Sequence, residues 1–432
     1  MKKLFVLTVV IILLCLSACS KDSISNTSKQ PVEITFWHAM SGDLEKSLQK
    51  MTTDFNTQKS NVHVTLVNQG NYSDLHQKLM AAGKSNQSPI LSQTYADWND
   101  EWIKAGIVEN LNPYITDSKI GWTKQELEDI YPVFREENQW GGNYYSLPFN
   151  KSIPVLFYNK TMLDESHVNI PTTWDEWREA SRTLTKVKAD GKGKIVGTGF
   201  ENSVFLELYN YVLQAGGEFY NVKTQQPAFN SPEGREGVAF VSDMMHDGTA
   251  RLAGEDQFMS TPFGRGDVAM YVGSSAGIPF VGKAVGNQFS WSTAVLPKGK
   301  KSVAYVQGTN ITMFHGGTDA QKLGAWMYMK YLLNKENSAY WAEQTGYLPV
   351  RTSVSTLDSY AQFLKVNPAQ AAAPKQLLAD RYLSRIPNAS AFEPVLSKEM
   401  EAILRGKKSV EQGLFDAEQV MKEVISQKAA LK

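Results

Sequence analysis

The chain of 432 residues is long enough for two large lobes, and its 42% hydrophobic content supplies ample material for a buried core. Lys plus Arg and Asp plus Glu both number 44, so no overall charge attracts nucleic acid or an anionic membrane surface. Both cysteines, Cys15 and Cys19, lie near the N-terminus, which excludes disulfide frameworks, cysteine metal sites and thiol nucleophiles from the rest of the chain. Six scattered histidines do not indicate a zinc site, and nucleotide-binding and EF-hand motifs are absent. We therefore expect no metal, no cofactor and no nucleic-acid partner.

The N-terminus has the pattern of a secretory signal. Lys2 and Lys3 precede an apolar stretch, Leu4 to Leu16, that is too short for an ordinary membrane-spanning helix. The stretch ends in Leu16-Ser17-Ala18-Cys19, which resembles the bacterial lipobox and implies a diacylated Cys19 as the mature first residue. We expect residues 1–18 to be a lipoprotein signal peptide and 19–31 a flexible tether, polar over nearly its whole length. The protein is then anchored by lipid to the extracytoplasmic face of a bacterial cell membrane.

The first part of the body alternates strand and helix patterns. Short apolar-rich or alternating segments predict strands, and apolar residues at helical spacing predict the helices between them. The predicted elements form a βαβαβ unit with a largely parallel sheet, whose strand ends provide a natural ligand crevice. In chain order they are the strand 32–38, the helix 44–55, the strand 62–67, the helix 75–82 and the strand 89–95.

A second series of elements begins at the strand 155–158. Thr173 to Glu176 predicts a capped helix start, and Ser231-Pro232 predicts another helix that runs to about Met245. The whole chain therefore predicts two α/β lobes. Further expected elements are strands at 195–199, 268–272, 289–296 and 310–314, helices at 319–333 and 336–345, and helical structure over the last forty residues.

One motif raises the question of an enzyme. Gly273-Ser274-Ser275-Ala276-Gly277 matches G-x-S-x-G after a predicted strand, the context of a hydrolase nucleophile. Such a triad needs an acid and then a histidine further along the chain, but no Asp or Glu lies between Ser275 and the only downstream histidine, His315. We expect no enzyme activity. The alternatives from other classes are an exported serine esterase that uses Ser275 and an adhesin-like lipoprotein.

Aromatic residues are frequent where the predicted strands end. The chain has 10 Trp and 18 Tyr, and Tyr72, Tyr95, Phe200 and Tyr347 all fall at strand ends or turns. Flat faces and hydroxyl groups around a crevice are typical of sites for small polyols and sugars.

Several segments resemble the extracellular solute-binding proteins of ABC importers. They are Ile34-Thr35-Phe36-Trp37-His38-Ala39-Met40, Gly70-Asn71-Tyr72, the stretch from Leu147 to Lys160 and Thr345-Gly346-Tyr347-Leu348-Pro349-Val350. Within that superfamily, the first two segments and Pro148-Phe149-Asn150-Lys151-Ser152 are similar to the branch that binds glycerol 3-phosphate and its diesters. The nearest alternative within the class is an oligosaccharide receptor of the maltodextrin type.

The resemblance implies a periplasmic-binding-protein type II fold, with two α/β lobes, three interlobe crossings and a ligand cleft between the lobes. The N-terminal lobe is expected to comprise 32–150 with 309–347, and the C-terminal lobe 151–308 with 348–432. The implied partners are a small solute and the membrane subunits of an ABC permease, to which the protein delivers its ligand as a monomer.

Ligand-binding positions of the branch carry over to this sequence by motif. They imply contacts from Tyr72, Ser152, Ser274 or Ser275, Gly308, Tyr347 and Arg385. An arginine fork with hydroxyl and N–H donors suits a phosphate group. The sequence departs from the branch at two places: Asp97 stands two residues after Tyr95 instead of beside it, and Phe200 and Ser203 stand where the branch has tryptophans. We include Tyr95, Asp97 and Phe200 in the expected site.

Overall fold

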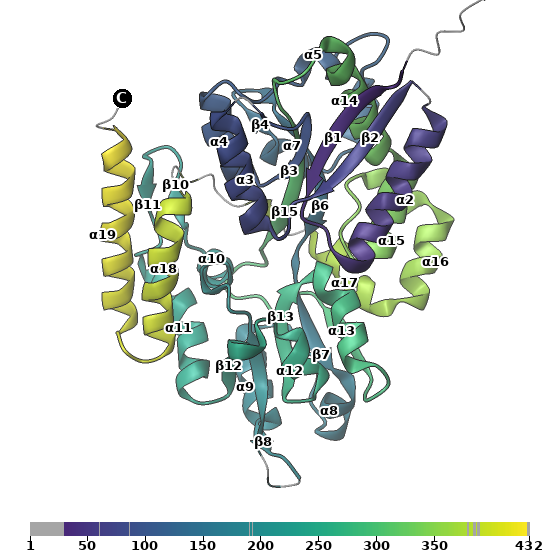
Figure 1. Cartoon of the computed structure of the whole chain (residues 1–432). Helices are drawn as coiled ribbons and strands as arrows, with labels where there is room; N and C mark the ends of the chain where they lie inside the picture. Colours follow the sequence, from purple (N-terminus) through teal and green to yellow (C-terminus); the bar gives the residue numbers. More distant parts are fainter. Residues whose placement is uncertain are drawn as a thin grey trace, which may run out of the picture.

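The computed structural model describes residues 30–59, 61–85, 87–189, 191, 193–377, 380–382, 386 and 389–429. The predicted signal peptide, the lipidation site Cys19 and the predicted ligand contact Arg385 lie outside these residues. Two α/β lobes are stacked one above the other, as the sequence predicted (Figure 1).

The first lobe is built on a mixed sheet in the order β16-β15-β3-β1-β2, with β6 also paired to β15. The strands β1, β2 and β3 run parallel, because each is followed by a crossover helix, and this confirms the predicted βαβαβ unit. Strand β15 runs antiparallel to β3 and β6. The bounds of these strands are β1 Val32–His38, β2 Val62–Asn68, β3 Leu91–Thr94, β6 Ser146–Ser152, β15 Ala304–Met313 and β16 Asp380–Tyr382.

The second lobe has a sheet of its own, in the order β12-β9-β13-β7-β14, with β8 on β9. Its central strand β13 pairs parallel to β9 and antiparallel to β7, and its residues are almost fully buried. The strands are β7 Pro154–Asn159, β8 Lys186–Val187, β9 Lys194–Phe200, β12 Ala250–Leu252, β13 Val268–Ser274 and β14 Trp291–Ala294. Two short hairpins complete the strands: β4 Gln139–Trp140 with β5 Asn143–Tyr144, and β10 Tyr220–Asn221 with β11 Gln226–Pro227.

The predicted helix starts are confirmed by their caps. The Thr173 hydroxyl accepts a hydrogen bond from the Glu176 N–H at 3.2 Å, and the Ser231 hydroxyl accepts one from the Gly234 N–H at 3.1 Å. The first-lobe helices are α2 Gly42–Gln58, α3 Tyr72–Lys84, α4 Ala96–Lys104, α5 Asn112–Ile115, α6 Lys124–Glu128, α7 Pro132–Glu137, α14 Asp319–Leu332 and α15 Lys335–Thr345. The remaining helices up to residue 376 are α8 Lys160–Glu165, α9 Trp174–Leu184, α10 Val204–Gln214, α11 Pro232–His246, α12 Ser260–Gly264, α13 Ile278–Val285, α16 Asp358–Val366 and α17 Ala372–Gln376. Among the described residues, no helix combines the length and apolar character that crossing a membrane requires.

The chain ends in two antiparallel helices, α18 Ala389–Leu404 and α19 Val410–Ala429. They pack beside α10 and α11 of the second lobe, and the yellow pair stands along one side of the molecule (Figure 1). The helical character predicted for the last forty residues is confirmed as far as residue 429, apart from the turn between the two helices.

The two lobes are joined where β6, β15 and the segment after α15 meet. The chain leaves the first sheet after Ser152 and enters the second at Pro154, so Ile153 lies at the crossing. Strand β15 runs past the same point, because its Gln307 and Gly308 pair with Ser152 and Lys151 of β6. A third contact brings Leu348 to the same point, since its N–H donates to the Lys151 carbonyl oxygen at 2.6 Å.

Lys151 is fully buried at this junction. Its ammonium group forms an ion pair with Glu137 of α7, donates to the Gly308 carbonyl oxygen at 3.2 Å, and lies over the Phe134 ring. Burial lowers the pKa of Lys151, while the neighbouring Glu137 carboxylate opposes this shift. The Lys151 side chain therefore connects its own strand β6 with α7 and β15 at the junction.

Gly308 is required at the junction by a close approach of two backbones. It has φ +102, and a Cβ atom there would lie 1.6 Å from the Asn150 carbonyl oxygen. Strands β6 and β15 therefore fit together only with glycine at this position, beside the irregularity in their register between Thr309 and Asn310.

Left-handed backbone strain by itself lowers the free energy of unfolding by about 1–2 kcal/mol. We expect Gly308→Ala to lower it by clearly more, because the new Cβ atom also meets the Asn150 carbonyl oxygen. Gly141→Ala is the matched control, because Gly141 has φ +59 and a Cβ atom at this position would meet no other atom within 4 Å. Urea unfolding of both variants measures the difference. Equal losses would contradict the close approach at Gly308.

Candidate functional site

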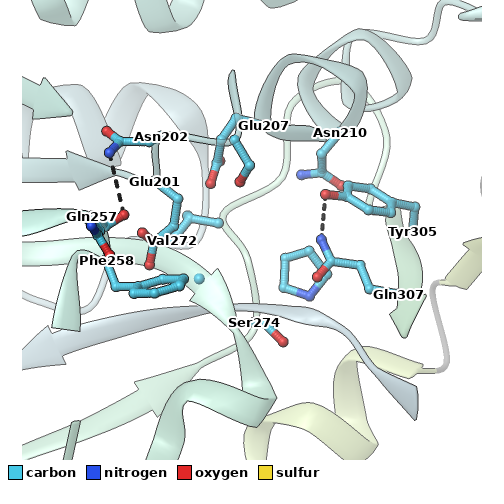
Figure 2. A pocket seen from close by; sticks show the side chains of 13 residues that line it. Glu201, Asn202, Glu207, Asn210, Gln257, Phe258, Val272, Ser274, Tyr305 and Gln307 are labelled. Carbon is cyan, nitrogen blue, oxygen red and sulfur yellow. Dashed lines mark hydrogen bonds between the residues drawn. The ribbon is translucent and has the colours of Figure 1, made fainter. Parts of the chain in front are cut away.

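A cavity of about 440 Å³ opens in the second lobe beside the junction. It is bounded by the ends of β9 and β13, the first turns of α10, the loop before α12 and the beginning of β15 (Figure 2). The residues around it are Pro154, Glu201, Asn202, Ser203, Glu207, Asn210, Gln257, Phe258, Val272, Gly273, Ser274, Tyr305 and Gln307.

Two carboxyl groups enter this cavity from neighbouring elements. Glu201 directly follows β9, and its Oε2 accepts a hydrogen bond from the Met259 N–H at 2.9 Å. Glu207 lies in the first turn of α10, and its carboxyl group accepts from the Glu201 N–H. Burial raises the pKa of Glu201 to about 7, and burial together with the Glu201 charge raises the pKa of Glu207 well above its ordinary value. Figure 2 shows both side chains directed into the same space.

Asn210 faces the cavity one helical turn after Glu207. The residue is 2% exposed, and neither its side-chain N–H₂ group nor its carbonyl oxygen has a hydrogen-bond partner among the described residues. A buried amide without partners costs about 1–3 kcal/mol, so such groups are commonly completed by water or a ligand. Across the same space, Gln307 donates to the Tyr305 hydroxyl. The cavity thus offers hydrogen-bond donors and acceptors that the protein itself leaves open.

A second polar cluster lies in the first lobe, around Tyr72 at the start of α3. The Asn150 Nδ2 donates to the Tyr72 hydroxyl at 3.3 Å, and the Tyr72 and Tyr347 hydroxyl groups interact. The ring of Tyr95 meets that of Tyr72 edge-on, with centroids 5.3 Å apart. Burial raises the pKa of all three tyrosines, so their hydroxyl groups stay neutral and able to donate.

This cluster and the second-lobe cavity adjoin along β15. Gln307 lines the cavity, and Thr309, two residues further along the same strand, is the register partner of Asn150. Asn150 is fully buried, and its Oδ1 has no hydrogen-bond partner in the part of the chain that the structure describes. A strand rises about 3.3 Å per residue, so the two polar regions are only about 7 Å apart along the chain. They form the two halves of one candidate site at the junction of the lobes.

The structure distributes the predicted site residues over several places. Tyr72, Tyr95 and Tyr347 gather in the first-lobe cluster, and Ser274 lines the second-lobe cavity. Ser152 and Gly308 lie in the strand pair at the junction; Ser152 is 3% exposed. Arg385 lies outside the described residues.

Two predicted contacts are buried elsewhere. Ser275 is fully buried, and its hydroxyl accepts from the Ile153 N–H at 3.3 Å, so the serine fastens the interlobe crossing. Phe200 is also fully buried and packs in the core against Trp177 and Tyr211. Neither side chain reaches the cavity.

Asp97 stands apart from the cavity, in the first turn of α4. Its carboxyl group accepts from the N–H groups of its own residue and of Trp98. Burial raises the pKa of Asp97 to about 7, helped by the charge of Glu393 on α18. The charge of Glu137 at the junction also raises this pKa, so Asp97 is within electrostatic range of both the C-terminal helix pair and the junction.

Sequence reasoning missed Glu201, Glu207 and Asn210. Glu201 could have been found from its position, because it follows the predicted strand 195–199 and Phe200 directly. Glu207 and Asn210 are polar residues three positions apart in the largely apolar helix Val204–Gln214. This spacing places both on one face of the helix and could have indicated a polar site there.

The sequence matches the family of bacterial extracellular solute-binding proteins over residues 50–372. The chain belongs to this family. It is therefore a bacterial extracellular solute-binding protein, and its curated relatives are periplasmic binding proteins.

Individual relatives bind different solutes. Over 400 residues the chain is 24% identical to the sn-glycerol-3-phosphate-binding periplasmic protein UgpB of Salmonella typhimurium, covering 89% of this chain and 90% of that protein. UgpB from Mycobacterium tuberculosis, solved with glycerophosphocholine, has a TM-score of 0.80 at 20% identity and covers 92% of this chain and 99% of that one. The sugar-binding protein MalE from Xanthomonas citri has a TM-score of 0.79 at 21% identity and covers 93% and 99%. At these identities the solved structures establish the fold.

The carboxyl group of Glu201 gives a prediction about pH. Folding raises its pKa from 4.5 to about 7, so the folded state holds the proton more tightly and stability falls as pH rises through this window. Glu201→Gln removes the titrating group and keeps an oxygen for the Met259 N–H. As pH rises from 5 to 8, we expect the free energy of unfolding of the variant to increase by about 1–3 kcal/mol relative to that of wild type.

Urea unfolding at the two pH values tests this expectation. Glu255→Gln, an exposed glutamate in the loop before α12, is the control and should follow wild type. If Glu201→Gln also follows wild type at both pH values, Glu201 does not carry the raised pKa.

Proposed function

We propose that the protein captures a glycerophosphodiester between its lobes and delivers it to a membrane permease. The observation that carries the proposal is the two-part site: a cluster of neutral tyrosine hydroxyls in the first lobe adjoins a carboxyl-lined cavity in the second. A diester has two chemically different ends joined by one phosphate, which suits two adjoining polar regions. The 24% identity to a glycerol-3-phosphate-binding protein over 89% of the chain supports the same class of solute.

Charge favours a diester over glycerol 3-phosphate itself. The described residues around the cavity include Glu201 and Glu207 but no Lys or Arg. A phosphate monoester carries close to two negative charges at neutral pH and a diester carries one, so a cavity without a cationic side chain among its described residues suits the diester better. In this proposal Arg385 binds the phosphate, as the sequence resemblance implies, and the remainder of the solute extends into the cavity.

An oligosaccharide is the second candidate. The same cavity favours it, because carboxyl and amide groups are suited to sugar hydroxyls and no cationic side chain is present among the described residues that line it. The two candidates differ in whether binding requires a phosphate.

Lobe closure accompanies capture in this proposal. The ion pair between Asp43 of α2 and Lys283 of α13 joins the lobes at their surface, away from the buried junction. Exposed ion pairs contribute little, so such a contact can open and re-form as the lobes move about the junction.

Calorimetry with glycerophosphocholine, glycerol 3-phosphate and maltose tests the proposed solute. We expect glycerophosphocholine to bind more tightly than glycerol 3-phosphate and maltose to bind weakly. Arg385→Ala should weaken the diester about ten- to a hundredfold, because a charged hydrogen bond is lost, while Arg405→Ala, at an exposed residue directly after α18, should not. Tight binding of maltose without binding of either phosphorylated solute would transfer the assignment to the oligosaccharide candidate.

We also propose that Cys19 anchors the protein to the membrane by lipid. Two acyl chains give stable anchoring where one does not, so Cys19→Ala should release the protein from washed membranes. Cys15→Ala is the matched control, since it changes the other cysteine four residues earlier. Fractionation in which Cys19→Ala stays with the membrane as firmly as Cys15→Ala would contradict the anchor.

A further inference from the structure

Phe258 has an unusual environment for a large aromatic residue. It is 67% exposed, although most aromatic side chains in the described part of the chain are buried, and it stands at the wall of the second-lobe cavity. An isolated exposed apolar residue needs no explanation, but one that lines a polar cavity offers a flat face to whatever enters it.

The loop that carries Phe258 is held in a strained conformation. Gln257 has φ +65, which is uncommon for a residue with a side chain. Asn202 fixes the start of the loop, because its side chain donates to the Gly254 carbonyl oxygen and accepts from the Gly254 N–H, both at 2.8 Å. On the other side, the Met259 N–H donates to Glu201. Strain held by surrounding bonds is typical of binding sites, and here it presents Phe258 beside Glu201.

Open hydrogen-bonding groups lie across the cavity from this ring. Figure 2 shows Phe258 on one side, Asn210 and Gln307 on the other, and Ser274 below. Within the described residues, both the side-chain donor and the side-chain acceptor of Asn210 are without a hydrogen-bond partner. A hydroxyl group donates and accepts at once, so it can satisfy both, whereas a cationic group would leave the Asn210 donor unpaired.

We propose that this cavity is a subsite for a hydroxyl-bearing ring at one end of the solute, with Phe258 against the C–H face of the ring. Asn210 and the two glutamates then bind its hydroxyl groups, and Phe258 sets the preference for a ring over a shorter chain. The proposal rests on the proposed function, in which the glycerophosphate portion is held by the first-lobe cluster and the cavity receives the group beyond the phosphate. The volume of about 440 Å³ leaves room for such a ring.

Calorimetry with glycerophosphoinositol, glycerol 3-phosphate and maltose tests the subsite. Wild type should bind glycerophosphoinositol more tightly. Phe258→Ala should weaken glycerophosphoinositol about two- to tenfold, as expected for a lost aromatic contact, and leave glycerol 3-phosphate unchanged. Phe258→Trp, which keeps a flat face, should retain binding. Phe415→Ala removes a ring that is 50% exposed on α19 and should change neither affinity.

The outcomes separate the subsite from the proposed function. If Phe258→Ala leaves glycerophosphoinositol unaffected, or weakens both phosphorylated solutes equally, the head-group subsite is overturned while the proposed function stands. If only maltose binds and Phe258→Ala weakens it, the ring subsite is supported and the diester is overturned. If none of the three solutes binds to folded wild-type protein, both proposals are overturned.

Discussion

The buried ammonium group of Lys151 is the constraint on which the junction of the two lobes depends. A charge without access to water is stable only if it is paired, and here the Glu137 carboxylate and the Gly308 carbonyl oxygen supply the partners. The backbone carbonyl oxygen of Lys151 also accepts a hydrogen bond from the Leu348 N–H. The residue thereby aligns the crossing strands, and Gly308 permits the close approach that this alignment demands. Removing one partner of such a pair typically costs about 3–5 kcal/mol, so the junction is a rigid base for movement at the surface.

The alignment of the crossings determines which polar groups meet in the site. Because β15 passes through the junction, Gln307 belongs to the cavity and Thr309 lies beside the tyrosine cluster. The side-chain amide of Asn210 and the Oδ1 of Asn150 are among the buried groups that have no hydrogen-bond partner within the described part of the chain. Buried polar groups without partners and buried carboxyl groups raise the free energy of the folded protein. A polar solute that forms hydrogen bonds with them offsets this on binding.

Local patterns of apolar and capping residues predicted most of the helices and strands. Alternation and helical spacing gave the βαβαβ unit, and cap residues such as Thr173 and Ser231 located helix starts because capping is a short-range interaction. The aromatic residues of the first-lobe cluster were predicted from motifs at strand ends. Ser275 and Phe200 were harder, because side chains one residue apart at a strand end point to different surroundings: Ser274 and Glu201 line the cavity while their neighbours are buried. Glu207 and Asn210 depend on which face of an apolar helix meets the cavity, and this is fixed only by tertiary packing. The division into 32–150 with 309–347 and 151–308 with 348–432 stays a proposal.

The central claim is that one solute contacts both halves of the site at once. Amide hydrogen exchange with and without saturating glycerophosphocholine tests it most directly, because protection reports where a ligand orders the chain. We predict protection in both lobes, at the start of α3 around Tyr72 and at residues 201–210 and 254–258, with α19 unchanged. Protection confined to one lobe, or absent from both segments while the solute is bound, would contradict a site shared between the lobes.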